Sequence, residues 1–179
     1  MELPILKLVF LVIVVYLSQV SAAEKDLSFG LLESSFDSDL DRLQKDIGYT
    51  FKNIGYLRQA MTHASFSQEN NNALSILGSH VIESSVSLLA LRQNIDVSPK
   101  DVGLKIAEMA TSCSVDGLRL KLNKVVRVSS NTDPSAPKVV CGAFRAIFGA
   151  VAVDNNKVDD AVSVFWSVHG VPSGKALSS

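Results

Sequence analysis

The sequence predicts an all-α fold of about seven helices packed as a single bundle. Apolar residues recur at three- and four-residue intervals through most of residues 38–169, which is the spacing of one face of a helix. The chain has 179 residues, of which 47% are apolar, enough for one domain with a substantial core. Its formal net charge of −1 gives no global electrostatic reason to expect nucleic acid or an anionic membrane as a partner.

The first 23 residues predict a secretory signal peptide. One lysine precedes an apolar run at 8–17, and small residues fill 21–23, where we expect cleavage after Ala22 or Ala23. The run is shorter than the roughly 20 residues of a membrane span, so no integral span is expected after cleavage. The alternative is a retained signal anchor. Localisation is therefore predicted to be the secretory pathway, in the endoplasmic reticulum lumen or outside the cell.

Two helices are predicted after a flexible segment at 24–37. The first spans about 38–48, and its buried face is formed by residues three and four apart: Leu40, Leu43 and Ile47. The second begins after Asn53, a residue type that caps helix N-termini well, and ends near His63.

Two long helices are predicted next. The first of them contains NNALSILGSHVI at 71–82. Its Gly78 indicates that another backbone packs closely there, because a glycine inside a helix costs about 1 kcal/mol relative to alanine. The second begins with Ser98 as N-cap and Pro99 at the first helical position.

The rest of the chain is predicted to contain a central buried helix, which is the most apolar segment of the domain. In order, the predicted elements are a short helix at 115–123, an extended stretch at 125–128, the central helix at 138–153, a last helix at 157–168 and a flexible tail at 170–179. Gly142 and Gly149 lie on one side of the central helix and predict close packing along that side.

Three sequence blocks resemble the ribonuclease III family. They are IGYTFKNIGYLRQAMTHAS at 47–65, NNALSILGSHVI at 71–82 and CGAFRAIFGAVAVD at 141–154, in the order and at the separations of that family. The resemblance implies a ribonuclease III-type helical domain at 38–169 that dimerises, and a double-strand-specific endoribonuclease that uses magnesium. Within the family the chain most resembles a small plant branch, which implies a role in nuclear fusion (karyogamy).

The chain departs from the family at the four metal-binding acids. The family's second block has a glutamate and, four residues later, an aspartate, where this chain has Ser75 and Ser79. The third block has an aspartate and, three residues later, a glutamate, where this chain has Gly142 and Arg145. Magnesium is a hard cation that prefers anionic oxygens, and Arg145 adds a fixed positive charge, so we expect no metal cofactor.

The missing acids favour a catalytically degenerate protein that acts by dimerisation or by binding a partner or RNA. The alternative function is the family's double-strand-specific endoribonuclease, active in RNA processing. The partner in a dimer is a second copy or a paralogue. Nearby acids are interpreted as solvated surface residues rather than as a rebuilt metal site: Glu69, Glu83 and Asp154.

Two further groups of residues are candidates for a function. One is a basic cluster that is interpreted either as a contact for double-stranded RNA, with Arg145 adding to it, or as a solvated helix end. Its members are Arg119, Lys121, Lys124 and Arg127. The other is the pair Cys113 and Cys141, which in an oxidising lumen form a disulfide and otherwise are two buried thiols.

Overall fold

In a computed structural model, residue 16 and residues 33–170 are described. The predicted signal segment, apart from residue 16, and residues 171–179 of the predicted tail lie outside the described residues. The chain divides into two units, Met1–Asp39 and Leu40–Ser179, and the bundle belongs to the second. The described part of the chain holds seven helices and no strand, which confirms the predicted fold class.

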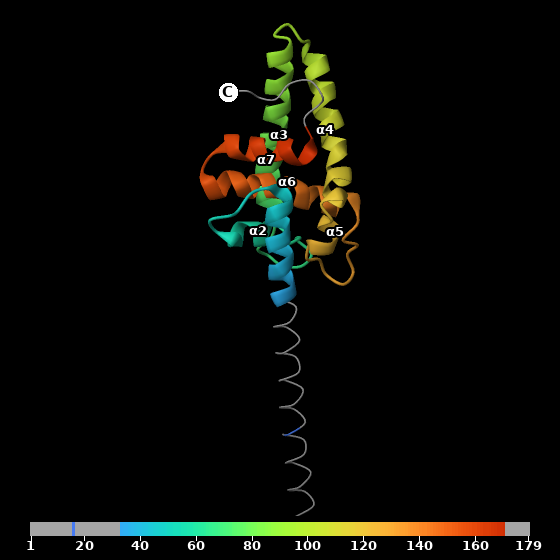
Figure 1. Cartoon of the computed structure of the whole chain (residues 1–179). Coiled ribbons are helices and arrows are strands. Elements are labelled where there is room, and N and C mark those ends of the chain that lie inside the picture. Colours follow the sequence, from blue (N-terminus) through green and yellow to red (C-terminus); the bar gives the residue numbers. More distant parts are fainter. Residues whose placement is uncertain (1–15, 17–32, 171–179) are drawn as a thin grey trace, which may run out of the picture. The chain divides into compact units, whose positions relative to one another are not determined.

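The helices are joined by short connections, except for the longer segments 61–71 and 126–136 (Figure 1). Residues 33–47 are helical, and then come α2 (Ile54–Ala60), α3 (Asn72–Gln93), α4 (Pro99–Arg119), α5 (Leu122–Val125), α6 (Pro137–Asn155) and α7 (Val158–His169). Both predicted N-caps are confirmed, because the side chains of Asn53 and Ser98 accept hydrogen bonds from the backbone N–H groups of Gly55 and Asp101.

Helix α6 is the central buried helix, as predicted. It is apolar on almost every side, and most of its residues are buried against α3, α4 and α7. Its aromatic residues continue into α7: the ring of Phe148 lies 5.0 Å from that of Phe144 and 5.3 Å from that of Phe165, both edge to face. Such contacts add to the burial of apolar area and fix α7 against α6.

Two glycines let α3 and α6 cross with their backbones in contact. A Cβ atom on Gly78 would lie 1.8 Å from the carbonyl oxygen of Arg145, and one on Gly149 would lie 2.0 Å from that of Leu74. The predicted close approach is therefore confirmed at Gly78 and Gly149. It is wrong at Gly142, where a Cβ would meet nothing within 4 Å.

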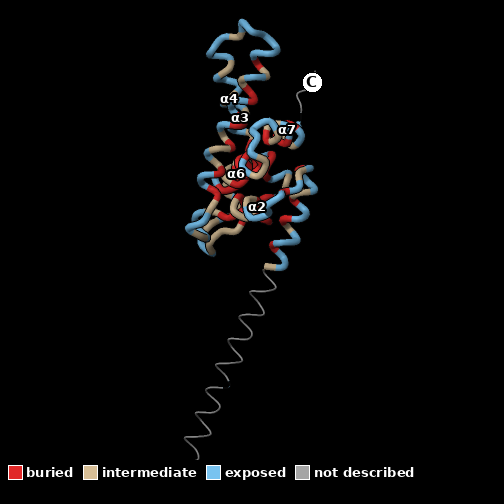
Figure 2. The backbone as a smooth tube through the Cα atoms, turned by 90° about the vertical axis from the view of Figure 1, so that its left-hand side faces the viewer, coloured by how far each residue is buried: buried red, intermediate tan, exposed pale blue. Residues whose placement is uncertain are grey.

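Helices α3 and α4 form a long hairpin that extends past α6 and α7 (Figure 1). Toward its tip the hairpin is mostly exposed (Figure 2), and it carries exposed apolar residues such as Leu91 and Ile95. Among the described residues, α3 is long and apolar enough to cross a membrane by length and composition alone. Its residues Leu74, Val81 and Val86 are buried, so we interpret α3 as a core helix.

The predicted short helix at 115–123 is wrong. Helix α4 continues to Arg119, because Cys113 and Gly117 are buried and continue its packed face past the polar stretch at 111–114. The helix stops at Lys121, whose φ of 58° is left-handed, and α5 then begins at Leu122. Tertiary packing overrides the weak helix preference of serine, threonine and cysteine.

Two smaller boundaries also differ from the predictions. The first helix is already present at residue 33 instead of beginning at Ser38, since Phe36 continues the spacing of Leu40 and Leu43. The stretch at 125–128 is extended only from Val126 onward, and Arg127 forms an isolated parallel bridge with Thr62.

Candidate functional site

The crossing of α3 and α6 places two of the four substituted metal positions around one small cavity. Ser79 of α3 and Arg145 of α6 both line it, together with Glu83 and residues of α4. Ser75 and Gly142 are half-exposed and do not line this cavity. The structure therefore brings Ser79 and Arg145 together, with one of the nearby acids, Glu83, beside them.

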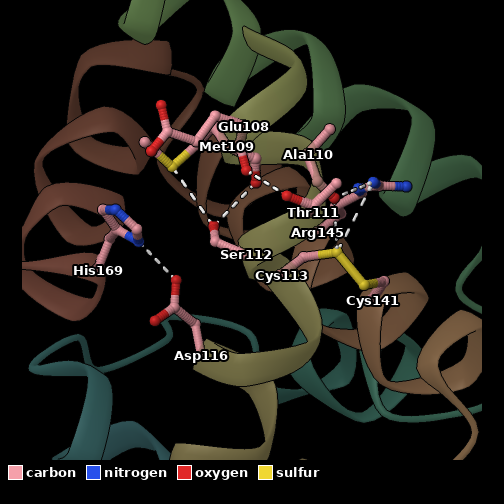
Figure 3. The surroundings of a disulfide bond; sticks show 10 residues. All are labelled: Glu108, Met109, Ala110, Thr111, Ser112, Cys113, Asp116, Cys141, Arg145 and His169. Atoms are coloured by element: carbon pink, nitrogen blue, oxygen red, sulfur yellow. Dashed lines mark hydrogen bonds and ion pairs between the residues drawn. A yellow bond between two sulfur atoms is a disulfide. The ribbon is translucent and has the colours of Figure 1, made fainter. Parts of the chain in front are cut away.

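Arg145 is fastened to α4 instead of extending into the cavity as a free cation. Its Nη2 donates a hydrogen bond to the carbonyl oxygen of Ala110 at 3.3 Å and lies 3.8 Å from the Sγ atom of Cys113 (Figure 3). Ser79 is also engaged, because its Oγ donates to the carbonyl oxygen of Ile76 at 2.8 Å. Both side chains thus complete contacts within the bundle.

A disulfide between Cys113 and Cys141 lies directly beside Arg145 (Figure 3). It joins α4 to α6 over a Cα–Cα distance of 5.0 Å. Cys141 precedes Arg145 by four residues, so both project from one side of α6 toward the same turn of α4. Here α4 and α6 are connected by a covalent bond and by a charged hydrogen bond.

The residues present do not fit the magnesium ion that the resemblance implies. The cavity has a volume of about 20 Å³, the space of a single water molecule, whereas magnesium keeps several of its waters. Glu83 is the one acid on its wall, and Arg145 places a permanent positive charge there. Among residues 33–170, no group of three or more His, Cys, Asp or Glu side chains is placed to hold a metal.

The interpretation of Asp154 as a solvated acid is wrong. Its carboxylate accepts hydrogen bonds from the backbone N–H groups of Lys52 and Asn53 and from the Tyr49 hydroxyl, each at 2.9 Å. Burial opposes its ionisation, but these three donors and the Lys52 charge outweigh burial and hold its pKa below the ordinary value. Burial, then the bond and charge of Asp154, raise the pKa of Tyr49 to about 12.

The predicted basic cluster does not form one uniform surface. Arg119 pairs with Asp116 at 2.9 Å and bonds to the carbonyl oxygen of Val168. Arg127 donates to the Thr62 hydroxyl at 3.2 Å and lies over the ring of Phe66 at 4.9 Å. Lys121 and Lys124 are exposed. Half of the cluster is thus committed to contacts within the chain.

A pair of side chains that the sequence did not predict, a buried aspartate and a partly exposed histidine, lies on the other side of α4. Asp116 is 4% exposed, and its Oδ2 lies 2.5 Å from Nδ1 of His169 at the end of α7 (Figure 3). These residues are 53 positions apart, in blocks outside the family motifs. Only the packing of α7 and α4 on the same neighbouring helices, α3 and α6, brings them together, so no local spacing could have revealed them.

The helical bundle has the fold of a ribonuclease III nuclease domain. Two solved structures of the nuclease domain of ribonuclease III from Campylobacter jejuni have this fold, each with a TM-score of 0.68. One is 23% identical and covers 72% of this chain and 94% of its own. It shows structural flexibility in a region of that protein involved in dimer formation. The other is 22% identical, covers 75% of this chain and 97% of its own. No protein-family model matches the chain.

The chain belongs to the ribonuclease III-like family that includes protein NUCLEAR FUSION DEFECTIVE 2 of Arabidopsis thaliana. That relative is 51% identical over 161 residues, covering 88% of this chain and 84% of its own length. Ribonuclease 3 of Wigglesworthia glossinidia brevipalpis is 33% identical over 127 residues, or 65% of this chain. The chain spans about half of that bacterial enzyme, 54% of its length.

Proposed function

We propose that this chain is a catalytically degenerate ribonuclease III-like protein that acts by forming a dimer, in the secretory pathway, as part of plant nuclear fusion. The observation that carries the proposal is the set of residues at the α3–α6 crossing. Where the family has four acids, this chain has two serines, a glycine and an arginine, and Arg145 is bound to α4. A site with a single nearby carboxylate, that of Glu83, and with a fixed cation is a poor match for magnesium, which needs several anionic oxygens to replace its waters.

A cleavage assay tests the loss of catalysis. The mature chain, incubated with long double-stranded RNA and magnesium, is expected to leave the RNA intact. Ribonuclease 3 from one of the bacterial relatives serves as the positive control under the same buffer. Cleavage that depends on magnesium and stops with EDTA would establish the alternative function, a double-strand-specific endoribonuclease in RNA processing, and would overturn the proposal.

The surface of α4 supports dimerisation. Five exposed residues without charge recur along this helix at intervals of three and four: Leu104, Ala107, Thr111, Val115 and Leu118. Val115 is 68% exposed, an unusual exposure for a valine. The stripe runs for about four turns, and small residues at its middle allow a second helix to approach closely.

Sedimentation of the mature protein at micromolar concentration tests the dimer. We expect the wild-type chain to sediment as a dimer and the Val115→Glu, Leu118→Glu variant as a monomer. Dimerisation through the α4 stripe would bury the two new carboxylates in an apolar interface, where their desolvation is costly. Val158→Glu, in the exposed first turn of α7, is the matched control and should leave the dimer unchanged. A monomeric wild type, or a dimer that survives the double substitution, contradicts this part of the proposal.

Binding of double-stranded RNA without cleavage is the second candidate function. The exposed Lys121 and Lys124 favour it, since lysines of this kind contact phosphates. The partners already held by Arg119 and Arg127 weaken it. Affinity for duplex RNA that falls steeply with salt and with Lys121→Gln, Lys124→Gln would favour this function over partner binding.

The location and the biological process remain part of the proposal. The disulfide supports a secretory location, because such bonds persist in oxidising compartments. The role in nuclear fusion rests on the name of the Arabidopsis relative. Tagged chains with and without residues 1–23 test the location: we expect only the full chain to enter the secretory pathway.

A further inference from the structure

A second cavity lies on the side of α4 away from the disulfide. Its volume is about 320 Å³, at the lower end of the range for small-molecule pockets, and residues of α3, α4 and α7 line it. Apolar side chains on its wall include Val86, Leu89 and Trp166. Ser112, His169 and Glu108 supply polar atoms. It shares Val86 and Met109 with the cavity at the α3–α6 crossing, but Ser79 and Arg145 do not line it.

His169 is held rigidly at the wall of this cavity. Its Nδ1 faces Oδ2 of the buried Asp116 at 2.5 Å, while the other oxygen of Asp116 faces Arg119 at 2.9 Å. The imidazole ring also stacks on the ring of Phe165, with centroids 5.5 Å apart and planes 10° apart. A carboxylate paired with arginine only accepts hydrogen bonds, so Nδ1 carries the proton. In the neutral imidazole, Nε2 is left as an acceptor.

The other polar side chains on this wall supply both acceptors and donors, and one of them, Gln93, carries an amide group that offers both. The hydroxyl of Ser112 donates to the carbonyl oxygen of Met109 at 2.9 Å, which leaves the lone pairs of its oxygen (Figure 3). Glu108 adds a carboxylate, and Lys105, three residues before it, adds a donor on the rim. Glu108 and Lys105 carry opposite charges, so the wall has no net charge of its own. A ligand that matches it is neutral and has an apolar body and an O–H or N–H donor for His169.

We propose that the cavity between α3, α4 and α7 binds a small neutral molecule with an apolar body and a hydroxyl donor, and that Nε2 of His169 accepts its hydrogen bond. The apolar body lies against Trp166 and Leu89, and Asp116 positions the imidazole without touching the ligand. This site is independent of the lost metal positions, so it does not rest on the proposed function.

Trp166 makes the proposal directly testable, because it is the only tryptophan of the chain and lies in the cavity wall. Three probes share one phenyl skeleton: 2-phenylethanol, its methyl ether and phenylacetate. We expect saturable changes in tryptophan fluorescence with 2-phenylethanol. The methyl ether, which lacks the donor, should bind about threefold to tenfold more weakly, the worth of one hydrogen bond. Phenylacetate should bind more weakly still.

Two variants separate the site from general stability. His169→Asn keeps a donor for Asp116 but removes the Nε2 acceptor, so it should bring the affinity for 2-phenylethanol down to that for the ether. Leu89→Phe fills the cavity and should abolish binding of all three probes. Leu88→Phe, at an exposed neighbouring position outside the cavity, is the matched control and should bind like the wild type.

Several results would overturn the proposal. The absence of saturation with every probe would mean that the cavity binds no such ligand. Equal affinities for the alcohol and the ether, or unchanged binding in His169→Asn, would eliminate the hydrogen bond to His169. Tightest binding of phenylacetate would show that the wall selects an anion.

Discussion

Asp154 determines where the segment before α2 attaches to the end of α6. One carboxylate accepts hydrogen bonds from two consecutive backbone N–H groups and from the Tyr49 hydroxyl, over more than 100 residues of sequence. The aspartate closes the third family block, yet in this chain its contacts are structural and lie at the far end of α6 from the substituted positions. Its role is therefore independent of any metal.

Replacement of Asp154 by asparagine should lower stability by about 1–2 kcal/mol, because asparagine has a single carbonyl acceptor for three donors. The loss should depend on pH at both ends. The pKa of Asp154 is lowered on folding, so its contribution is present above the unfolded value near 4 and is lost as pH falls through the folded pKa. The pKa of Tyr49 is raised to about 12, so its contribution is lost as pH rises from about 10 toward that value.

Urea unfolding of the wild type and Asp154→Asn between about pH 3 and pH 11 tests this prediction. The difference in unfolding free energy should be largest between about pH 5 and 9 and shrink on either side. Tyr49→Phe should remove the alkaline change alone. A difference that stays constant across the whole range would contradict the assigned partners.

At the scale of single elements, the crossing of α3 and α6 shows what sequence could and could not predict. The sequence predicts close helix packing at Gly78 and Gly149, because glycine destabilises a helix interior and is usually found there where another backbone comes close. Gly142 has the same sequence context but faces open space, which only the positions of the neighbouring helices reveal. The end of α4 was mispredicted because the buried face at Cys113 and Gly117 depends on α6.

The three glycines give a matched substitution series. Gly78→Ala and Gly149→Ala should each lower stability by about 2–3 kcal/mol or more, because the new methyl group would lie about 2 Å from a backbone oxygen that cannot turn away. Gly142→Ala should raise stability by about 0.5–1 kcal/mol through helix propensity alone. Thermal unfolding measures all three. An equal, small effect at all three positions would show that the helices do not touch.

At the scale of the whole molecule, the sequence predicts the fold class but not the contacts between distant segments. The three family blocks and the helical spacing were enough for the bundle, since each reports a local pattern. The sequence does not decide between a disulfide and two thiols, because pairing depends on whether Cys113 and Cys141 face each other. The Asp116–His169 pair and both cavities required the packed structure, because their residues come from separate helices.

Loss of the disulfide should lower the stability of the entire bundle. The bond closes a loop with a sequence separation of 28, for which chain entropy gives about 3–4 kcal/mol. Urea unfolding of the wild type should shift by that amount when a reductant is added. The Cys113→Ser, Cys141→Ser variant should unfold like the reduced wild type and show no response to reductant. A shift below about 1 kcal/mol would show that the bond hardly constrains the unfolded chain.

The contact between Gly78 and Gly149 has a consequence for how such a chain changes over generations. The packing of α3 on α6 requires glycine at both of these positions, because a side chain at either would collide with the other helix. Ser75 and Gly142, in contrast, are half-exposed, and a side chain at Gly142 would meet no neighbouring atom. Substitutions at those two positions therefore need not disturb the packing of α3 on α6. The proposed loss of catalysis thus requires no change of fold, provided that Gly78 and Gly149 are kept.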